Sequence, residues 1–435
     1  MKDSSALRAR HLGFSLASLG APAVGAFLAL PTLLARLSPE AFGLLTMYWV
    51  IIGYASLVEL GMGKAVAKRI AELDEASEVD PRSVIGTAIW AATLIGIATA
   101  LLCIPLLHIV FGALIDIPPQ LDTLNRDSII WIAATVPILV LASVLSGALE
   151  ARRDFGWLAF IRVPTGLALF LIPAVLAKLG FALPELVAGI MVVRLLLLSL
   201  LAIRVEHIWP RAVSRPRYDA LQLRSLLGFG GWLTISAIVG PLLVYLDRFI
   251  LASTHGLATS ALYSTAFEAV IRFLVVASAV VAVMFPRFAN LKTGDKFPAR
   301  RLYLEGNLYV LGAIMPVALA FILFGHFLFS NWLGGAALDQ NSLATITRAA
   351  AILGVGLVLN ACAHIPQAFV QGRGHPHWTA GLHIVELCAF LLYAPLIIKN
   401  YGVEGAAWTW LIRSAISCIL LYVMAARIRR IQALV

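Results

Sequence analysis

The sequence predicts an all-α, polytopic membrane protein with about twelve transmembrane helices in two parallel six-helix repeats. Three observations support this fold class: the composition, the length of the apolar stretches and an internal repeat. Hydrophobic residues make up 61% of the 435 residues and charged residues only 13%, about half the charged share of a soluble domain. The charges gather between long apolar stretches, which is the pattern of a chain whose solvent is lipid.

Six stretches in the first half are long enough to cross a bilayer, which takes roughly 20 mostly apolar residues. The first runs from about 12 to 37. It is longer than the roughly 7–15-residue core of a signal peptide, so we expect it to stay in the protein. The other five follow in order at 41–63, 84–112, 128–150, 157–177 and 183–203.

Six further stretches follow a basic segment at 205–225. They lie at 226–252, 257–285, 302–325, 343–369, 377–398 and 403–426. All twelve are continuously apolar and too long for the alternating strands of a membrane barrel. The sequence therefore predicts an N-terminal lobe at 1–204, a cytoplasmic linker at 205–225 and a C-terminal lobe at 226–435.

Basic residues occupy every second loop, and this sets the predicted orientation. The basic side holds Lys2, Arg8, Arg10, Lys64, Lys68, Arg69, Arg82, Arg152, Arg153, Arg204, Arg211, Arg215, Arg217, Arg224, Arg287, Lys292, Lys296, Arg300, Arg301, Arg373, Arg427, Arg429 and Arg430. The opposite side holds only Arg36, Arg126, Lys178, Arg348 and Lys399. The positive-inside rule then places both termini in the cytoplasm. We expect the basic linker to contact anionic lipid headgroups, so the net charge of +10 does not indicate a nucleic-acid partner.

The second half of the chain echoes the first. Trp157, Ala159, Arg162 and Lys178 recur as Trp378, Ala380, His383 and Lys399, each 221 residues later (378 − 157 = 221). Glu185 and Arg194 recur as Glu404 and Arg413, each 219 later (413 − 194 = 219), and Leu34, Ala35, Ala41 and Leu45 recur as Leu251, Ala252, Ala258 and Leu262, each 217 later (251 − 34 = 217). Because each half has an even number of spans, both enter the membrane in the same direction. Many transporters that work by alternating access are built from such repeats.

Prolines in the first span of each half are candidate gating positions. Pro22 and Pro31 interrupt the first span and Pro241 interrupts the seventh. A proline removes a backbone hydrogen bond and bends the helix. The alternative is the ordinary use of proline in membrane helices.

Ionisable residues at membrane depth are the candidate functional residues, because a charge there is costly and faces a cavity or a partner. Arg272 lies mid-way along the eighth span, with Glu268 one turn earlier on the same face. A planar guanidinium suits a phosphate-bearing substrate anion, and the alternative is a structural ion pair. Arg194 and Arg413 occupy matching midpoints of the sixth and twelfth spans and are either anion contacts or structural residues.

The remaining candidates are carboxylates and one arginine. Asp247 and Arg248 are neighbours near the outer end of the seventh span, so they point to different helix faces and serve either an outer gate or an interfacial anchor. Glu386 and Glu59 are candidate supporting or ion-coupling groups, and snorkelling also explains Glu59 near a span end. No metal site is predicted from the histidines at 364, 375, 377 and 383, because no carboxylate or cysteine stands at a recognised spacing.

Two segments resemble a known family. The residues Phe42-Gly43-Leu44-Leu45, Tyr54, Glu59-Leu60-Gly61-Met62-Gly63 and Arg69-Ile70-Ala71 resemble the second span of the Wzx-like polysaccharide flippases, in the multidrug/oligosaccharidyl-lipid/polysaccharide superfamily. The residues Asp247-Arg248-Phe249-Ile250-Leu251, Gly256, Leu262-Tyr263-Ser264, Glu268, Arg272 and Pro286 resemble their seventh and eighth spans. One departure is Glu59-Leu60, where the family usually has an aspartate or asparagine before the glycine.

The resemblance implies a MATE-like fold in the cell inner membrane and a flippase, not an enzyme, for O-antigen-type surface polysaccharide. The implied substrate is an undecaprenyl-pyrophosphate-linked oligosaccharide, moved from the cytoplasmic to the outer leaflet without a cofactor. The first, second, seventh and eighth spans would line the cavity, which favours Arg272 over Arg194 and Arg413. Coupling to H+ or Na+ and contact with a polysaccharide polymerase or ligase stay open.

Two other classes of function stay open. A drug or cation antiporter of the same superfamily would need acidic groups deep in the cavity, whereas the deep residues here are mainly arginines. A membrane polymerase, ligase or glycosyltransferase acting on the same lipid-linked sugar usually needs a sizeable outer loop. The longest outer loops, at 112–127 and 330–340, are short, and the sequence has no P-loop, GxSxG or HExxH motif.

Overall fold

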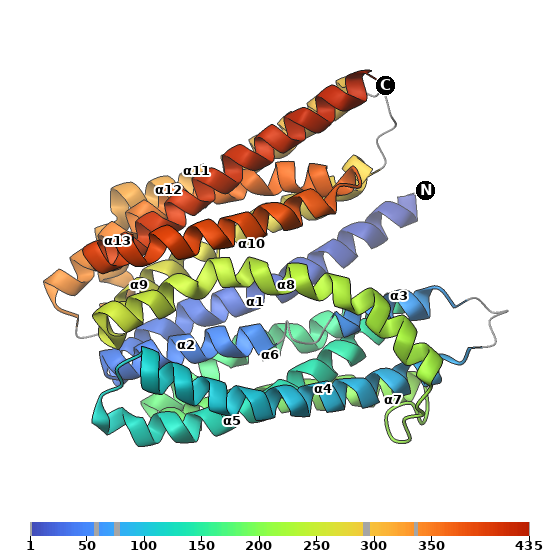
Figure 1. The fold of residues 1–435 in the computed structure, drawn as a ribbon, viewed down its shortest axis with the longest axis horizontal. Coiled ribbons are helices and arrows are strands. Elements are labelled where there is room, and N and C mark those ends of the chain that lie inside the picture. Colours follow the sequence, from blue (N-terminus) through green and yellow to red (C-terminus); the bar gives the residue numbers. More distant parts are fainter. Residues whose placement is uncertain (1, 56–60, 74–78, 290–295, 335–337, 435) are drawn as a thin grey trace. The chain divides into compact units, whose positions relative to one another are not determined.

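The computed structural model describes residues 2–434 except 56–60, 74–78, 290–295 and 335–337, and its regular structure there is helical (Figure 1). Side chains are described over 17–428, apart from those gaps and from 19, 54–55, 227–241, 286, 289, 296–300 and 376. The first half contains α1 (Lys2–Arg36), α2 (Pro39–Ala55), α3 (Met62–Ala71), α4 (Pro81–Ile109), the π-helical turn η1 (Val110–Leu114), α5 (Pro119–Ala151), α6 (Phe155–Lys178) and α7 (Leu183–Ile208). The second contains α8 (Ala220–His255), α9 (Leu257–Ile271), α10 (Leu274–Ala289), α11 (Lys296–Trp332), α12 (Gln340–Gly372) and α13 (Pro376–Leu434).

Most of the helices lie over the predicted spans, but the span predicted at 41–63 is described as α2 (Pro39–Ala55) and the beginning of α3 (Met62–Ala71), with 56–60 outside the described residues. Within the described residues, eight helices are long and apolar enough to cross a membrane, and the shorter apolar helices Gly20–Arg36 and Pro39–Gly53 lie in the first two predicted spans. α13 covers the last two predicted spans, because it consists of two helices joined at Gly402, where φ is 54°. The span predicted at 257–285 is divided between α9 and α10.

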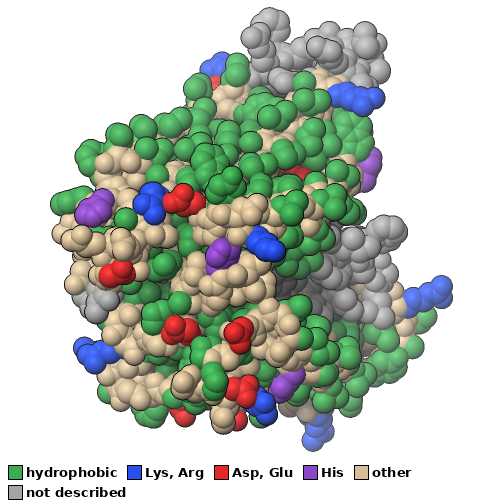
Figure 2. All heavy atoms as spheres, turned by 60° about the vertical axis from the view of Figure 1, so that its left-hand side comes forward, with side chains coloured by type: hydrophobic (Ala, Val, Ile, Leu, Met, Phe, Trp, Pro, Cys, Tyr) green, Lys and Arg blue, Asp and Glu red, His purple; other side chains and the backbone are tan. Residues whose placement is uncertain are grey.

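Large hydrophobic side chains lie on the outside of these helices. Leu102, Leu323 and Leu392 are among those exposed, and green hydrophobic side chains cover much of the surface in Figure 2. An apolar surface of this extent is unfavourable in water and favourable in hydrocarbon. The chain is therefore a multi-pass membrane protein.

The described residues form two units that share one packing scheme. In the first unit, Met1–Pro241, α5 packs against α2, α4 and α7. In the second unit, Leu242–Val435, α12 takes the place of α5 and packs against α9, α11 and α13. α2 and α9 are the second spans of the two repeats, α4 and α11 are the third, and α7 and α13 include the sixth, so this packing agrees with the predicted duplication.

The basic segment after α7 packs on the first unit. A Cβ atom at Gly86 of α4 would lie 2.5 Å from the backbone nitrogen of Arg217, so the segment lies directly against that helix. Arg69 of α3 donates a hydrogen bond from Nε to Gln222 at 3.1 Å. The first packed unit therefore continues beyond the segment predicted as a linker, while the lobe boundaries at 204 and 226 stay predictions about the repeat.

α3 and α5 meet backbone to backbone through two glycines. A Cβ atom at Gly147 would lie 2.0 Å from the carbonyl oxygen of Gly63, which leaves no room for any side chain. Gly61 precedes α3 with φ at 63°, a conformation that glycine adopts without steric cost. Structure therefore explains both glycines of the Gly61-Met62-Gly63 motif: Gly61 forms the turn before α3, and Gly63 allows the close crossing of α3 and α5.

Candidate functional site

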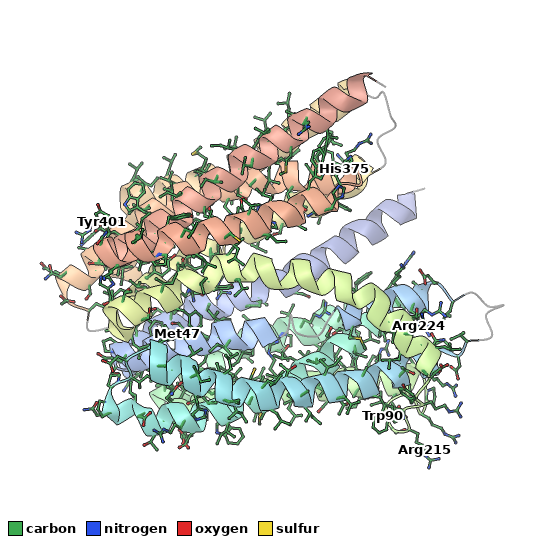
Figure 3. The ribbon with its side chains drawn as sticks, viewed as in Figure 1. Met47, Trp90, Arg215, Arg224, His375 and Tyr401 are labelled. Carbon is green, nitrogen blue, oxygen red and sulfur yellow. The ribbon has the colours of Figure 1, made fainter. Side chains whose placement is uncertain are left out.

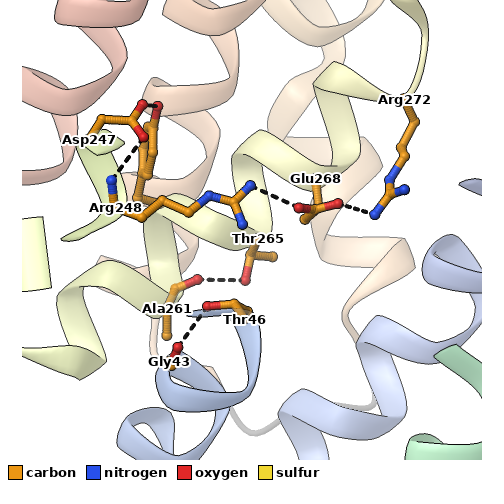
Figure 4. A network of polar contacts seen from close by, with 9 residues as sticks. Gly43, Thr46, Asp247, Arg248, Ala261, Thr265, Glu268 and Arg272 are labelled. Atoms are coloured by element: carbon orange, nitrogen blue, oxygen red, sulfur yellow. Dashed lines mark hydrogen bonds and ion pairs between the residues drawn. The ribbon is translucent and has the colours of Figure 1, made fainter. Parts of the chain in front are cut away.

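Three charged side chains form a line in the core of the second unit (Figure 4). Arg248 of α8 donates a hydrogen bond from Nη2 to Oε1 of Glu268 in α9 at 2.8 Å. Glu268 accepts from Arg272 with its other oxygen, Oε2. One carboxylate therefore binds two guanidinium groups, and the three side chains together carry one net positive charge.

Arg248 is the enclosed member of this trio. Its side chain is only 1% exposed, and its guanidinium lies 4.7 Å from the ring centroid of Phe267 and 5.1 Å from that of Tyr245. Contacts with two aromatic faces and one carboxylate hold a buried guanidinium in place. Asp247 and Arg248 are both buried inside the protein, and their roles as an outer gate or an interfacial anchor stay predictions.

Arg272 differs from Arg248 because it stands at a break in the helix. α9 ends at Ile271 and α10 begins at Leu274. Across the break, Phe273 N–H donates to Val270 O at 3.3 Å and Val275 N–H donates to Arg272 O at 3.3 Å, the i to i+3 pattern of a tightened turn. The Arg272 side chain is 26% exposed. Irregular backbone inside a membrane span is tolerated where it is buried in protein or lines a cavity.

Asp247 has a partner that no pattern in the sequence predicted. The hydroxyl of Tyr263 donates a hydrogen bond to Oδ2 of Asp247, and the backbone N–H of Arg248 donates to Oδ1 at 2.8 Å. Asp247 and Tyr263 are both buried. The hairpin turn at Gly256 could have indicated this pair, because the two residues lie at similar distances on either side of it.

The buried charges of the second unit balance. Among the described residues, the core holds the buried Arg248 and Arg413 and the half-buried Arg272 on one side of the balance and the buried Asp247, Glu268 and Glu386 on the other, so excess positive charge does not by itself favour an anionic substrate. Exposure distinguishes the groups instead. The side chains of Glu268 and Glu386 are 9% and 2% exposed, well below Arg272. Arg272 is thus the most exposed of these six charged side chains.

Arg413 and Glu386, both in α13, form a second buried cluster. Oε2 of Glu386 lies 3.1 Å from Nδ1 of His383. The other carboxylate oxygen, Oε1, has no hydrogen-bond partner among the described residues. Nε and Nη2 of Arg413 likewise lack partners there, and the guanidinium lies 5.9 Å from the ring centroid of Trp410. The cluster is buried yet incompletely paired, and burying unpaired polar atoms costs free energy. A functional role would explain why the protein keeps it.

The other sequence candidates are spread over the first unit or lie outside the described residues. Arg194 lies half-buried in α7, while its repeat mate Arg413 is buried. Pro22 and Pro31 lie within α1, but Pro105, Pro137, Pro164 and others also lie inside helices, so position alone does not set them apart. Pro241 lies in a stretch of α8 whose side chains are not described, and Glu59 lies outside the described residues.

Comparisons with known proteins agree on the family and the fold. A family model described as "Polysaccharide biosynthesis protein" matches residues 33–336. A Shigella flexneri protein named "Putative O-antigen transporter" is 27% identical over 406 residues, which is 92% of this chain and 94% of that protein. An inward-facing MATE family transporter of the MOP superfamily has a TM-score of 0.74 at 15% identity, covering 96% of this chain and 95% of its own. The lipid II flippase MurJ in an inward closed conformation has a TM-score of 0.76 at 14% identity, covering 94% and 86%. At these identities the two structures establish the fold alone, and it is the predicted MATE-like fold.

Proposed function

The chain belongs to this family of polysaccharide biosynthesis proteins, and from that premise we propose that it is a flippase for a lipid-linked oligosaccharide. Its substrate is an undecaprenyl-pyrophosphate-linked sugar that moves from the cytoplasmic to the outer leaflet of the inner membrane. The observation that carries the proposal is the side chain of Arg272, which is 26% exposed and stands at the break between α9 and α10. The named relatives, an O-antigen transporter and a lipid II flippase, support this class of substrate.

Arg272 binds the diphosphate of the substrate in this proposal. A guanidinium offers two parallel N–H groups to a phosphate, and such bidentate bonds are among the strongest polar contacts. Glu268 holds Arg272 in place before the substrate arrives. Because Arg248 also pairs with Glu268, the carboxylate keeps a partner when Arg272 turns to the substrate.

Transport follows alternating access by the two six-helix units, with both chain termini in the cytoplasm. The positive-inside pattern of the loops supports this orientation. The duplication supports alternating access, because parallel repeats are a recurrent architecture of transporters. The basic segment at 205–225 contacts anionic headgroups of the inner leaflet.

The test uses cells that lack this protein and carry either the wild type or a variant. With Arg272→Ala, surface polysaccharide disappears and the lipid-linked oligosaccharide accumulates on the cytoplasmic leaflet, while the protein inserts normally. Arg272→Lys keeps the charge but loses the planar fork, so it restores part of the activity. The matched control is Arg348→Ala in the same unit, an exposed arginine that pairs with Glu404 at 2.6 Å.

Three outcomes would overturn the proposal. Wild-type polysaccharide with Arg272→Ala would remove this arginine from the mechanism. Accumulation of the oligosaccharide on the outer leaflet would indicate a polymerase or ligase instead. Resistance to cationic drugs that depends on the protein, with unchanged polysaccharide, would indicate a drug antiporter.

Energy coupling in this proposal falls on Glu386. Asp247 and Glu268 are already fully engaged, whereas Glu386 keeps one buried oxygen without a partner among the described residues and contacts His383 with the other. A buried carboxylate of this kind can take up H+ or Na+. Flipping in vesicles should respond to an imposed ion gradient with the wild type and with the control Glu404→Gln, and lose that response with Glu386→Gln. An unchanged response would exclude Glu386 as the coupling group.

A further inference from the structure

The two units carry copies of one loop, between the fourth and fifth spans of each repeat. It joins α5 to α6 at 152–154 and α12 to α13 at 373–375, 221 residues later (373 − 152 = 221). Both loops make the same two backbone hydrogen bonds. In the first unit, Arg153 N–H donates to Glu150 O at 2.9 Å and Asp154 N–H donates to Leu149 O at 3.1 Å. In the second unit, Gly374 N–H donates to Gln371 O at 3.0 Å and His375 N–H donates to Val370 O at 3.1 Å. Both ends have the backbone pattern of a helix that closes with a left-handed residue.

A tryptophan follows each loop, and an arginine from the last helix of the repeat, α7 or α13, lies over its ring. In the first unit, Arg204 lies 5.2 Å from the ring centroid of Trp157. Asp154 in the loop binds the same arginine, at 2.8 Å from Nη2 and 2.9 Å from Nε. The first unit thus supplies its own anion to this site.

The second unit has a matching tryptophan, Trp378, and an arginine over its ring, but a histidine replaces the aspartate of the loop. Arg427 lies 6.0 Å from the ring centroid of Trp378, and it stands one helical turn beyond Val423, the residue that matches Arg204 at the 219-residue offset (423 − 204 = 219). His375 stands where Asp154 stands in the first unit. Within the described part of the chain, no carboxylate pairs with Arg427.

The surroundings of Trp378 offer hydrogen-bond donors. The ring of His375 lies 5.1 Å from that of Trp378, and the ring of His377 lies 5.8 Å from that of His375. Figure 3 labels His375 at the beginning of α13. Arg427 and His377 are exposed, and His375 and Trp378 are half-buried, so a ligand can reach all four. A guanidinium and imidazole N–H groups are donors suited to phosphate oxygens.

We propose that Arg427, His375 and His377 bind a phosphate group over Trp378, in the position that the Asp154 carboxylate takes in the first unit. The ligand is the headgroup phosphate of an anionic phospholipid. The site lies at the end of membrane-spanning helices and combines a tryptophan with an arginine, which is the chemistry of the membrane interface. This site does not depend on the transported substrate, so it stands apart from the proposed function.

The experiment measures equilibrium binding to the purified full-length protein and not transport. Phosphatidylglycerol is titrated into the protein in phosphatidylcholine nanodiscs, and inorganic phosphate is titrated in parallel as the soluble probe. The wild type should bind phosphatidylglycerol, and His375→Asp should weaken that binding at least about tenfold, because the new carboxylate pairs with Arg427 as Asp154 pairs with Arg204. Arg427→Gln should weaken it similarly.

The first unit provides a matched gain-of-binding variant. Asp154→His removes the internal anion and should add a phosphatidylglycerol site without changing the one in the second unit. His375→Ala serves as a second loss variant if His375→Asp does not fold. Binding that is unchanged in both His375 variants and in Arg427→Gln would overturn the proposal. Equal affinity for inorganic phosphate would assign the site to a soluble phosphate and overturn the lipid as ligand.

Discussion

The two units pack their helices in the same way but treat charge in opposite ways. At the 217-residue offset, Asp247, Arg248, Glu268 and Arg272 of the second unit match Leu30, Pro31, Ile51 and Ala55 of the first (247 − 30 = 217). The first unit instead places ion pairs near helix ends, where Arg162 meets Glu150 and Arg204 meets Asp154, each at 2.8 Å. The two repeats thus share part of their packing, and these four charged positions occur in only one of them.

This difference indicates where the specialised chemistry lies. A polar pair at a helix end stays partly hydrated and costs little, whereas charges at mid-span must be fully paired or the fold loses stability. The packing scheme does not need these charges, because the first unit forms it with apolar residues. The charged core of the second unit is therefore best explained by function, and three matched pairs of substitutions test the comparison between the units.

The largest expected effect comes from Glu268→Gln, which removes the carboxylate that Arg248 and Arg272 share. Two guanidinium groups then lose their partner inside the unit, and we expect a loss of about 3–5 kcal/mol in the free energy of unfolding. The matched control is Glu150→Gln in the first unit, whose partner Arg162 is 37% exposed, and it should cost less than about 1 kcal/mol. Denaturation of both variants in detergent measures the difference, and equal losses would contradict a distinction between the two cores.

A smaller effect is expected where the units differ in backbone contact. Gly147→Ala places a methyl group against the carbonyl of Gly63 and should destabilise the protein by about 1–3 kcal/mol. The matching residue of the second unit is already an alanine, Ala368, at the 221-residue offset (368 − 147 = 221). Ala368→Gly should therefore cost only about 0.5–1 kcal/mol, mainly through chain entropy. Thermal unfolding of the two variants would show whether the close crossing of α3 and α5 is confined to the first unit.

The smallest effect is a gain in stability. Arg153 has φ at 59°, a left-handed conformation that costs a non-glycine residue free energy, while its match in the second unit is Gly374 with φ at 84°. Arg153→Gly should raise the free energy of unfolding by roughly 0.5–1 kcal/mol, and Gly374→Ala should lower it by a similar amount. Denaturation curves of the pair give both signs, and destabilisation by Arg153→Gly would show that the arginine side chain makes a compensating contact.

Local patterns predicted one half of the polar network and missed the other. Glu268 and Arg272 are four residues apart on one helix, so their contact followed from helical periodicity. Arg248 and Glu268 are 20 residues apart on neighbouring helices (268 − 248 = 20), and Asp247 and Tyr263 are 16 apart (263 − 247 = 16). Contacts of this kind depend on how the two helices are rotated against each other, which no single stretch of sequence specifies.

The sequence by itself determined the membrane spans, their even number and the duplication. These follow from the thickness of the hydrocarbon core and from the cost of placing charge in it, and both act on each segment separately. Only the tertiary structure decided which charges pair, that Arg248 is enclosed while Arg272 is partly exposed at a helix break, and that an arginine lies over each repeated tryptophan. The physical reason is that the partner and the exposure of a side chain depend on how helices distant in the chain pack together. The same apolar pattern is compatible with many such packings.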